Sequence, residues 1–116
     1  MSAPAAGAAG GAAAPAGFGI LVTSPGRFAA RGELTFANAK GARSEGLHAL
    51  RTSTSRDLEV DCSGITHSDS AGLAVLLDWM AVMKREGRPL CFANLPSGLL
   101  AVARISGVEE MLQKGV

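Results

Sequence analysis

The feature that most constrains this chain is an apolar segment with helical periodicity, residues 70 to 86. Laid out at about 100° per residue, it has one apolar stripe that must face a sheet. The stripe consists of Leu73, Leu76, Leu77, Met80 and the stem of Lys84. Ser68, Asp69 or Ser70 is suited to cap the helix, and Gly87 is placed to end it. The sequence therefore predicts a long helix packed against a sheet.

Shorter elements surround this helix. The expected elements are a hairpin over 20–34 with a Pro25-Gly26 corner, a helix over 38–50, a strand over 58–62, a turn over 63–69, a strand over 89–93, a helix capped by Ser97 that stops at Gly107, and a turn over 109–113. Gly41 and Gly46 weaken the first helix, although helix remains the better choice there. This order predicts a single α/β domain, with a mixed sheet of four to five strands packed against three to four helices.

The first 17 residues are almost entirely Ala, Gly and Pro. Such a segment cannot bury enough apolar surface to offset the entropy lost on ordering. We therefore expect a disordered tail over residues 1–17 and a folded domain over 18–116. The start of the chain also lacks the basic residues and the apolar run of a secretory signal, so no export is expected.

The overall charge excludes two classes of partner. With 11 basic and 10 acidic residues along the chain, the net charge is +1. Neither nucleic acid nor an anionic membrane surface is expected to bind such a chain. The longest strongly apolar stretch, 73–83, contains Asp78 and is far shorter than the roughly 20 residues that span a bilayer. A soluble, cytoplasmic protein with no direct membrane insertion is expected.

The cysteines give no indication of a metal or cofactor. Cys62 and Cys91 each lie in a short apolar run, where a thiol usually behaves as a small buried hydrophobic group. Two cysteines with this spacing form neither a metal-binding motif nor a disulfide framework. We expect no metal and no cofactor.

A second arc of the long helix is more apolar than a solvated face should be. It carries Ala71, Val75, Asp78, Trp79, Val82 and Arg85. Trp79 has two interpretations of about equal weight. It is either a core residue under a neighbouring helix, or part of a partner-binding ridge with Val75 and Val82, which lie at helical spacing. In the second case Asp78 and Arg85 form the polar rim of the ridge.

An enzyme is not expected. His67, Asp69 and Ser70 are the residue types of a nucleophilic triad, but three residues within four positions cannot readily form the required chain of hydrogen bonds. The sequence also has no Gly-rich phosphate-binding loop with its lysine, so any ATP chemistry belongs to a partner. No catalytic residue is predicted.

Several motifs, taken in order, resemble the STAS domain family, which occurs in anti-sigma factor antagonists and transporter-associated proteins. They are Gly-Glu-Leu at 32–34, Val60-Asp61 at the end of a strand, DSAGLAVLL at 69–77 and ARISGV at 103–108. No single motif is diagnostic, but their order and spacing agree. The resemblance covers residues 18–113 and implies a STAS fold.

Within that family, the helix start resembles the MlaB-type STAS subunits of the lipid-asymmetry ABC transporter. This resemblance implies a non-enzymatic accessory or regulatory subunit for phospholipid trafficking between membranes. Its partner would be the transporter's cytoplasmic ATPase and, through it, a membrane permease, which holds the subunit at the inner membrane. The implied interface contains Asp69, Ser70, Ala71 and Gly72, together with the outward residues Val75, Asp78, Trp79 and Val82.

One departure from the family pattern bears on the alternative function. In anti-sigma factor antagonists the phosphorylated serine immediately precedes a Gly-Leu pair, and here that position is Ala71. The hydroxyl lies one residue earlier, which makes Ser70 the candidate phosphorylation site. A phosphate at Ser70 would add negative charge beside Asp69 at a helix terminus. The alternative, an anti-sigma factor antagonist that binds an anti-sigma serine kinase, is accordingly the weaker of the two.

Overall fold

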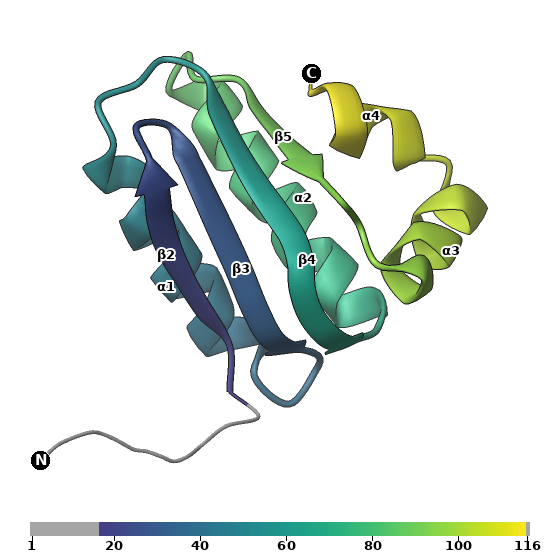
Figure 1. Cartoon of the computed structure of the whole chain (residues 1–116). Coiled ribbons are helices and arrows are strands. Elements are labelled where there is room, and N and C mark those ends of the chain that lie inside the picture. Colours follow the sequence, from purple (N-terminus) through teal and green to yellow (C-terminus); the bar gives the residue numbers. More distant parts are fainter. Residues whose placement is uncertain (1–16, 116) are drawn as a thin grey trace, which may run out of the picture.

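The computed structural model describes residues 17–115 of the 116-residue chain, so the tail predicted over 1–17 lies outside the described residues except for Gly17. The strands within 17–115 are β2 (Gly19–Ser24), β3 (Arg27–Leu34), β4 (Leu58–Ser68) and β5 (Leu90–Ala93). They form one sheet in this order (Figure 1). β2 pairs antiparallel with β3, whereas β3, β4 and β5 are parallel. The predicted mixed sheet is confirmed.

The described residues also form helices α1 (Ala39–Thr52), α2 (Ser70–Arg85), α3 (Ser97–Ser106) and α4 (Glu109–Lys114). Figure 1 shows α1 and α2 side by side behind the sheet, with α3 and α4 beyond β5. The predicted α/β class is therefore confirmed. The prediction that Ser97 caps α3 is wrong, because Ser97 is the first residue of the helix and Pro96 occupies the cap position without a side-chain hydrogen bond.

Strand β4 is longer than predicted. The turn expected over 63–69 is wrong, because β4 continues to Ser68 and pairs with the last residues of β3, with His67 opposite Glu33 and Ser68 opposite Leu34. A register shift interrupts the pairing near Ser63, whose backbone N–H donates to the Asp61 carboxylate at 2.9 Å. Pairing with β3 thus keeps this polar segment extended, although the segment has little strand propensity of its own.

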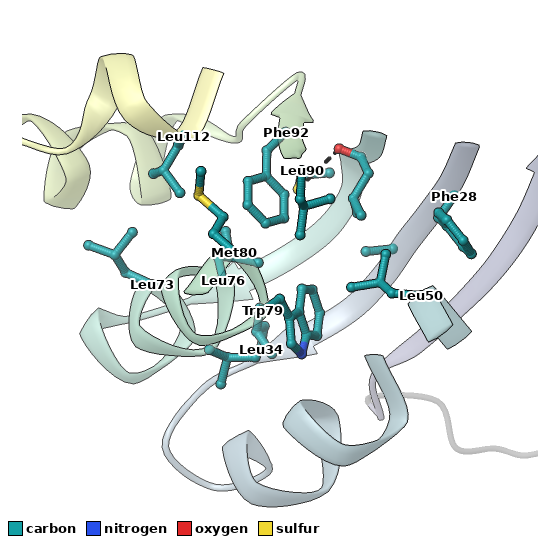
Figure 2. Packing of buried hydrophobic residues seen from close by; sticks show 14 of the residues in the cluster. Phe28, Leu34, Leu50, Leu73, Leu76, Trp79, Met80, Leu90, Phe92 and Leu112 are labelled. Atoms are coloured by element: carbon teal, nitrogen blue, oxygen red, sulfur yellow. Dashed lines mark hydrogen bonds between the residues drawn. The ribbon is translucent and has the colours of Figure 1, made fainter. Parts of the chain in front are cut away.

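The core lies between the sheet and the helices, with α1 and α2 contributing most of the buried helical side chains. Phe28, Val60 and Phe92 occupy neighbouring register positions on β3, β4 and β5, and all three are buried. The predicted stripe of α2 adds buried side chains to the same core, with Leu77 half-buried, and Figure 2 shows Leu50 of α1 beside Phe28. Lys84 is exposed. The orientation predicted for this stripe is confirmed for Leu73, Leu76 and Met80.

The two cysteines differ in environment. Cys62 is fully buried, and this burial raises the pKa of its thiol to about 12. Cys91 lies on β5 and is only half-buried, so it is less enclosed than expected. Both are free thiols.

Candidate functional site

The start of α2 is fixed to the loop between β3 and α1 by one carboxylate. Asp69 occupies the cap position of α2, and its Oδ1 accepts a hydrogen bond from the backbone N–H of Gly72 at 3.1 Å. Its Oδ2 accepts another from the backbone N–H of Phe36 at 3.0 Å. The Phe36 N–H is the main cause that holds the pKa of Asp69 below its ordinary value. Asp69 therefore remains ionised and ties two segments together.

Gly72 brings the first turn of α2 against the end of β3. A Cβ atom at this position would lie 2.2 Å from the carbonyl oxygen of Leu34, so no side chain fits. Gly72 itself is buried, whereas Ser70 is exposed and Ala71 half-buried. We call Asp69, Ser70 and Ala71 the helix-start surface. Gly72 shapes this surface without offering a side chain to a partner.

The prediction of an outward ridge on α2 is wrong. Trp79 is 0% exposed, and Val75 and Val82 are 5% and 6% exposed. The indole Nε1 of Trp79 donates to the backbone carbonyl of Arg43 in α1 at 3.1 Å, and Figure 2 shows this nitrogen turned away from the sheet. The alternative interpretation, a core tryptophan under a neighbouring helix, is confirmed. These three residues are not available for partner contact.

The reason for the burial lies in α1. A Cβ atom on Gly46 would stand 2.1 Å from Cζ2 of Trp79, so the helix backbone lies directly on the ring. The rings of Phe18 and Phe92 complete the enclosure, with centroids 5.8 Å and 6.4 Å from that of Trp79. An interior glycine weakens a helix, and Gly46 was the sequence feature that could have indicated this close approach.

Asp78 lies on the outer side of α2, as predicted. Its side chain is exposed and its Oδ2 accepts a hydrogen bond from Nε of Arg43 at 2.9 Å. Arg85 is exposed as well. Asp78 therefore lies at the edge of the contact between α1 and α2 and not at the rim of a free ridge.

Sequence reasoning missed Phe36, which lies beside the helix-start surface. Its side chain is 84% exposed, although its backbone N–H is bound by Asp69. The available indication was a large aromatic residue outside every periodic segment, between Thr35 and Ala37.

The triad residue types do not assemble. Nδ1 of His67 lies 3.8 Å from a carboxylate oxygen of Glu33, and both Asp69 oxygens accept backbone N–H groups. Among residues 17–115, no three side chains of the metal-binding types gather closely enough to hold an ion. Nor does the described part of the chain contain a helix with the length and apolarity to cross a bilayer.

Comparison with solved structures gives two informative relatives. The anti-sigma factor antagonist SpoIIAA in its unphosphorylated form has a TM-score of 0.64 and 17% identity, over 81% of this chain and 84% of that one. At this identity the similarity shows the fold alone. A chain of the Acinetobacter MlaFEDB complex, in its ATP-bound Vtrans2 conformation, has a TM-score of 0.64 and 28% identity, over 74% of this chain and 90% of that one.

Sequence comparison agrees with the structural one. No curated protein matches the chain significantly. A family model described as "Mlab, STAS domain", however, matches residues 22–113, which include every described strand and helix except the ends of β2 and α4. The resemblance found in the sequence motifs is thereby confirmed, and the chain belongs to the MlaB-type STAS domain family.

Proposed function

We propose that this chain is a non-catalytic accessory subunit that binds the cytoplasmic ATPase of an ABC transporter for phospholipid trafficking between membranes. Through the ATPase it associates with a membrane permease, which keeps it at the cytoplasmic side of the inner membrane. The family model and the similarity to a chain of the Acinetobacter MlaFEDB complex support an accessory role in such a transporter.

The observation that carries the proposal is the construction of the helix-start surface. Asp69 uses both carboxylate oxygens to hold backbone groups, and Gly72 fixes the first turn of α2 against β3. Ser70 and Ala71 are thus presented on a rigid frame, with small side chains that allow a partner to approach closely. A preorganised surface loses little conformational entropy on binding.

A docked subunit can regulate an ATPase only if it binds one conformational state of the ATPase more tightly than another. Binding of the helix-start surface shifts the ATPase towards one arrangement if the contacted face differs between its states. A subunit that contacts all ATPase states equally adds stability without changing their populations. The chain therefore acts through binding energy, with no chemical step of its own.

The direct test is affinity purification of the full chain from its native cells, followed by identification of the recovered subunits. The proposal expects an ABC ATPase together with a membrane permease. Recovery of a serine kinase without these proteins would instead support an anti-sigma factor antagonist. The absence of a hydroxyl at Ala71, where such antagonists are phosphorylated, weighs against that outcome.

A matched pair of variants connects the partner to the surface. Ser70→Asp places a charge beside Asp69 and is expected to release the ATPase. Thr54→Asp places the same charge on an exposed residue that precedes β4, whereas Ser70 follows the end of that strand. Thr54→Asp should retain the ATPase. Equal retention by both variants would remove the helix-start surface from the interface.

A further inference from the structure

We infer that Phe36 is an aromatic anchor, which inserts into an apolar pocket on the ATPase when the helix-start surface docks. This inference rests on the proposed function and names a contact residue that the sequence motifs do not include. Three observations support it: the ring is exposed, its loop is held by hydrogen bonds, and the Phe36 backbone N–H donates a hydrogen bond to Asp69.

The exposure of Phe36 leaves a large apolar group in water. Its side chain is 84% exposed, and the transfer of such apolar surface from water into a partner's interior is favourable. Aromatic residues are enriched in the cores of protein interfaces, where single side chains contribute much of the binding energy. Burial of the Phe36 ring in a partner would therefore contribute favourably to the free energy of binding.

The loop that carries Phe36 is held by a network of hydrogen bonds. Asn38 accepts from the Thr35 backbone N–H at 2.9 Å through Oδ1 and donates to the Glu33 carbonyl at 2.8 Å through Nδ2. The Ala37 backbone N–H donates to the Thr35 hydroxyl oxygen at 3.3 Å. The Phe36 backbone N–H itself donates to Asp69. The backbone that carries the ring is therefore held in place before binding, which lowers the entropic cost of docking.

The hydrogen bond from the Phe36 backbone N–H to Asp69 places the Phe36 loop next to the helix-start surface. Oδ2 of Asp69 lies 3.0 Å from the Phe36 nitrogen, and Ser70 is the next residue along the chain. A partner that covers Ser70 therefore also meets the loop of Phe36. The partner surface implied by these groups is an apolar pocket with hydrogen-bonding groups at the edge that faces Ser70.

Single exposed apolar residues are common on protein surfaces, so a test of Phe36 needs a control residue of similar exposure in the same chain. Ile105 provides it, because its side chain is 89% exposed and belongs to α3. Its neighbour Arg104 pairs with Glu109 within the C-terminal region and not with the start of α2. Ile105 is therefore matched to Phe36 in exposure but lacks the connection to Asp69.

The test measures binding of the purified full chain to the ATPase that is recovered with the wild-type protein. Phe36→Ala is expected to raise Kd at least about tenfold, a loss typical of an interface anchor. Phe36→Trp should restore most of the affinity, because it returns an aromatic ring to the same rigid loop. Ile105→Ala should leave Kd within about twofold. Both alanine variants should melt at the wild-type temperature, because neither side chain is part of the core.

The outcomes separate this inference from the proposed function. If the wild-type chain recovers no ABC ATPase, the proposed function and the anchor both fail. If the ATPase binds wild type and Phe36→Ala equally, only the anchor fails. If Ile105→Ala weakens binding as much as Phe36→Ala, the effect reflects general loss of apolar surface, and the assignment of Phe36 is likewise overturned.

Discussion

Gly46 of α1 lies directly against the indole ring of Trp79 in α2, where a Cβ atom would stand 2.1 Å from Cζ2. This contact closes α1 over the outer side of α2 and encloses a side chain that the sequence also allowed as a binding ridge. The two helices are further joined by the ion pairs of Arg43 with Asp78 and of Arg51 with Glu86. The contact between α1 and α2 is thus an apolar centre with a charged rim.

Two glycines of α1 should respond in opposite directions to the same substitution. Gly46→Ala forces the helices apart and is expected to lower the free energy of unfolding by about 1–3 kcal/mol, the usual cost of overpacking. Gly41→Ala introduces a Cβ that meets nothing within 4 Å and should raise it by about 0.5–1 kcal/mol. Urea titrations followed by circular dichroism measure both. Stabilisation by both alanines would mean that α1 does not rest on Trp79.

Truncation of Trp79 should destabilise the whole domain. Trp79→Ala removes a fully buried ring and its hydrogen bond to the Arg43 carbonyl, and it should lower the free energy of unfolding by about 3–5 kcal/mol. Trp79→Phe keeps an apolar ring and should cost less. Circular dichroism in urea is the appropriate measurement. A Trp79→Ala variant as stable as wild type would contradict the burial of the indole.

The Asp69 carboxylate should make stability depend on pH in the acid range. Because the Phe36 N–H lowers the pKa of Asp69 in the folded state, the ionised carboxylate stabilises the fold. That contribution is complete above the unfolded value of about 3.9 and is lost as the pH falls through the lower folded pKa. Asp69→Asn should therefore be less stable than wild type at pH 7, and the difference should shrink below about pH 4.

Urea midpoints of wild type and Asp69→Asn, measured between about pH 7 and pH 3, check this prediction. Asp61 also has a lowered pKa, chiefly because of the Ser63 N–H, but it is present in both proteins and cancels in the comparison. A difference that stays constant across this range would show that the charge of Asp69 does not stabilise the fold.

Arg88 should be a structural residue that lysine cannot replace. Its half-buried guanidinium donates to the backbone carbonyls of Leu50, Ser53 and Ser55, which joins the end of α1 to the segment before β5. A lysine ammonium cannot reach these carbonyls in the same geometry. Arg88→Lys is expected to lower the free energy of unfolding by about 1–3 kcal/mol. The exposed Arg85→Lys is the control, with an expected change within about 0.5 kcal/mol.

The sequence predicted the fold more completely than it predicted the site. Apolar periodicity identified the inward stripe of α2, and Gly107 ended α3 with a positive φ of 75°, as expected from its position. The length of β4 could not be predicted in the same way. Gly64 and Ser68 are turn-forming residue types, and pairing with Arg31 and Leu34 of β3 keeps them extended.

The site was partly hidden because periodicity describes a helix face but not what covers it. Val75, Trp79 and Val82 form an apolar arc in either case, and the sequence could not decide between α1 and another protein as its cover. Phe36 was missed for the opposite reason. It belongs to no periodic pattern, and its position depends on a bond to Asp69, which lies 33 residues away in the sequence.

The enclosure of Trp79 also gives the chain an optical property. It is the only tryptophan, and the sequence contains no tyrosine, so ultraviolet emission excited at tryptophan wavelengths arises from one buried indole. That emission should shift to the red when α1 separates from α2. Arrival of another protein at Ser70 should leave its wavelength unchanged, so the intrinsic fluorescence of this chain distinguishes loss of folding from loss of assembly.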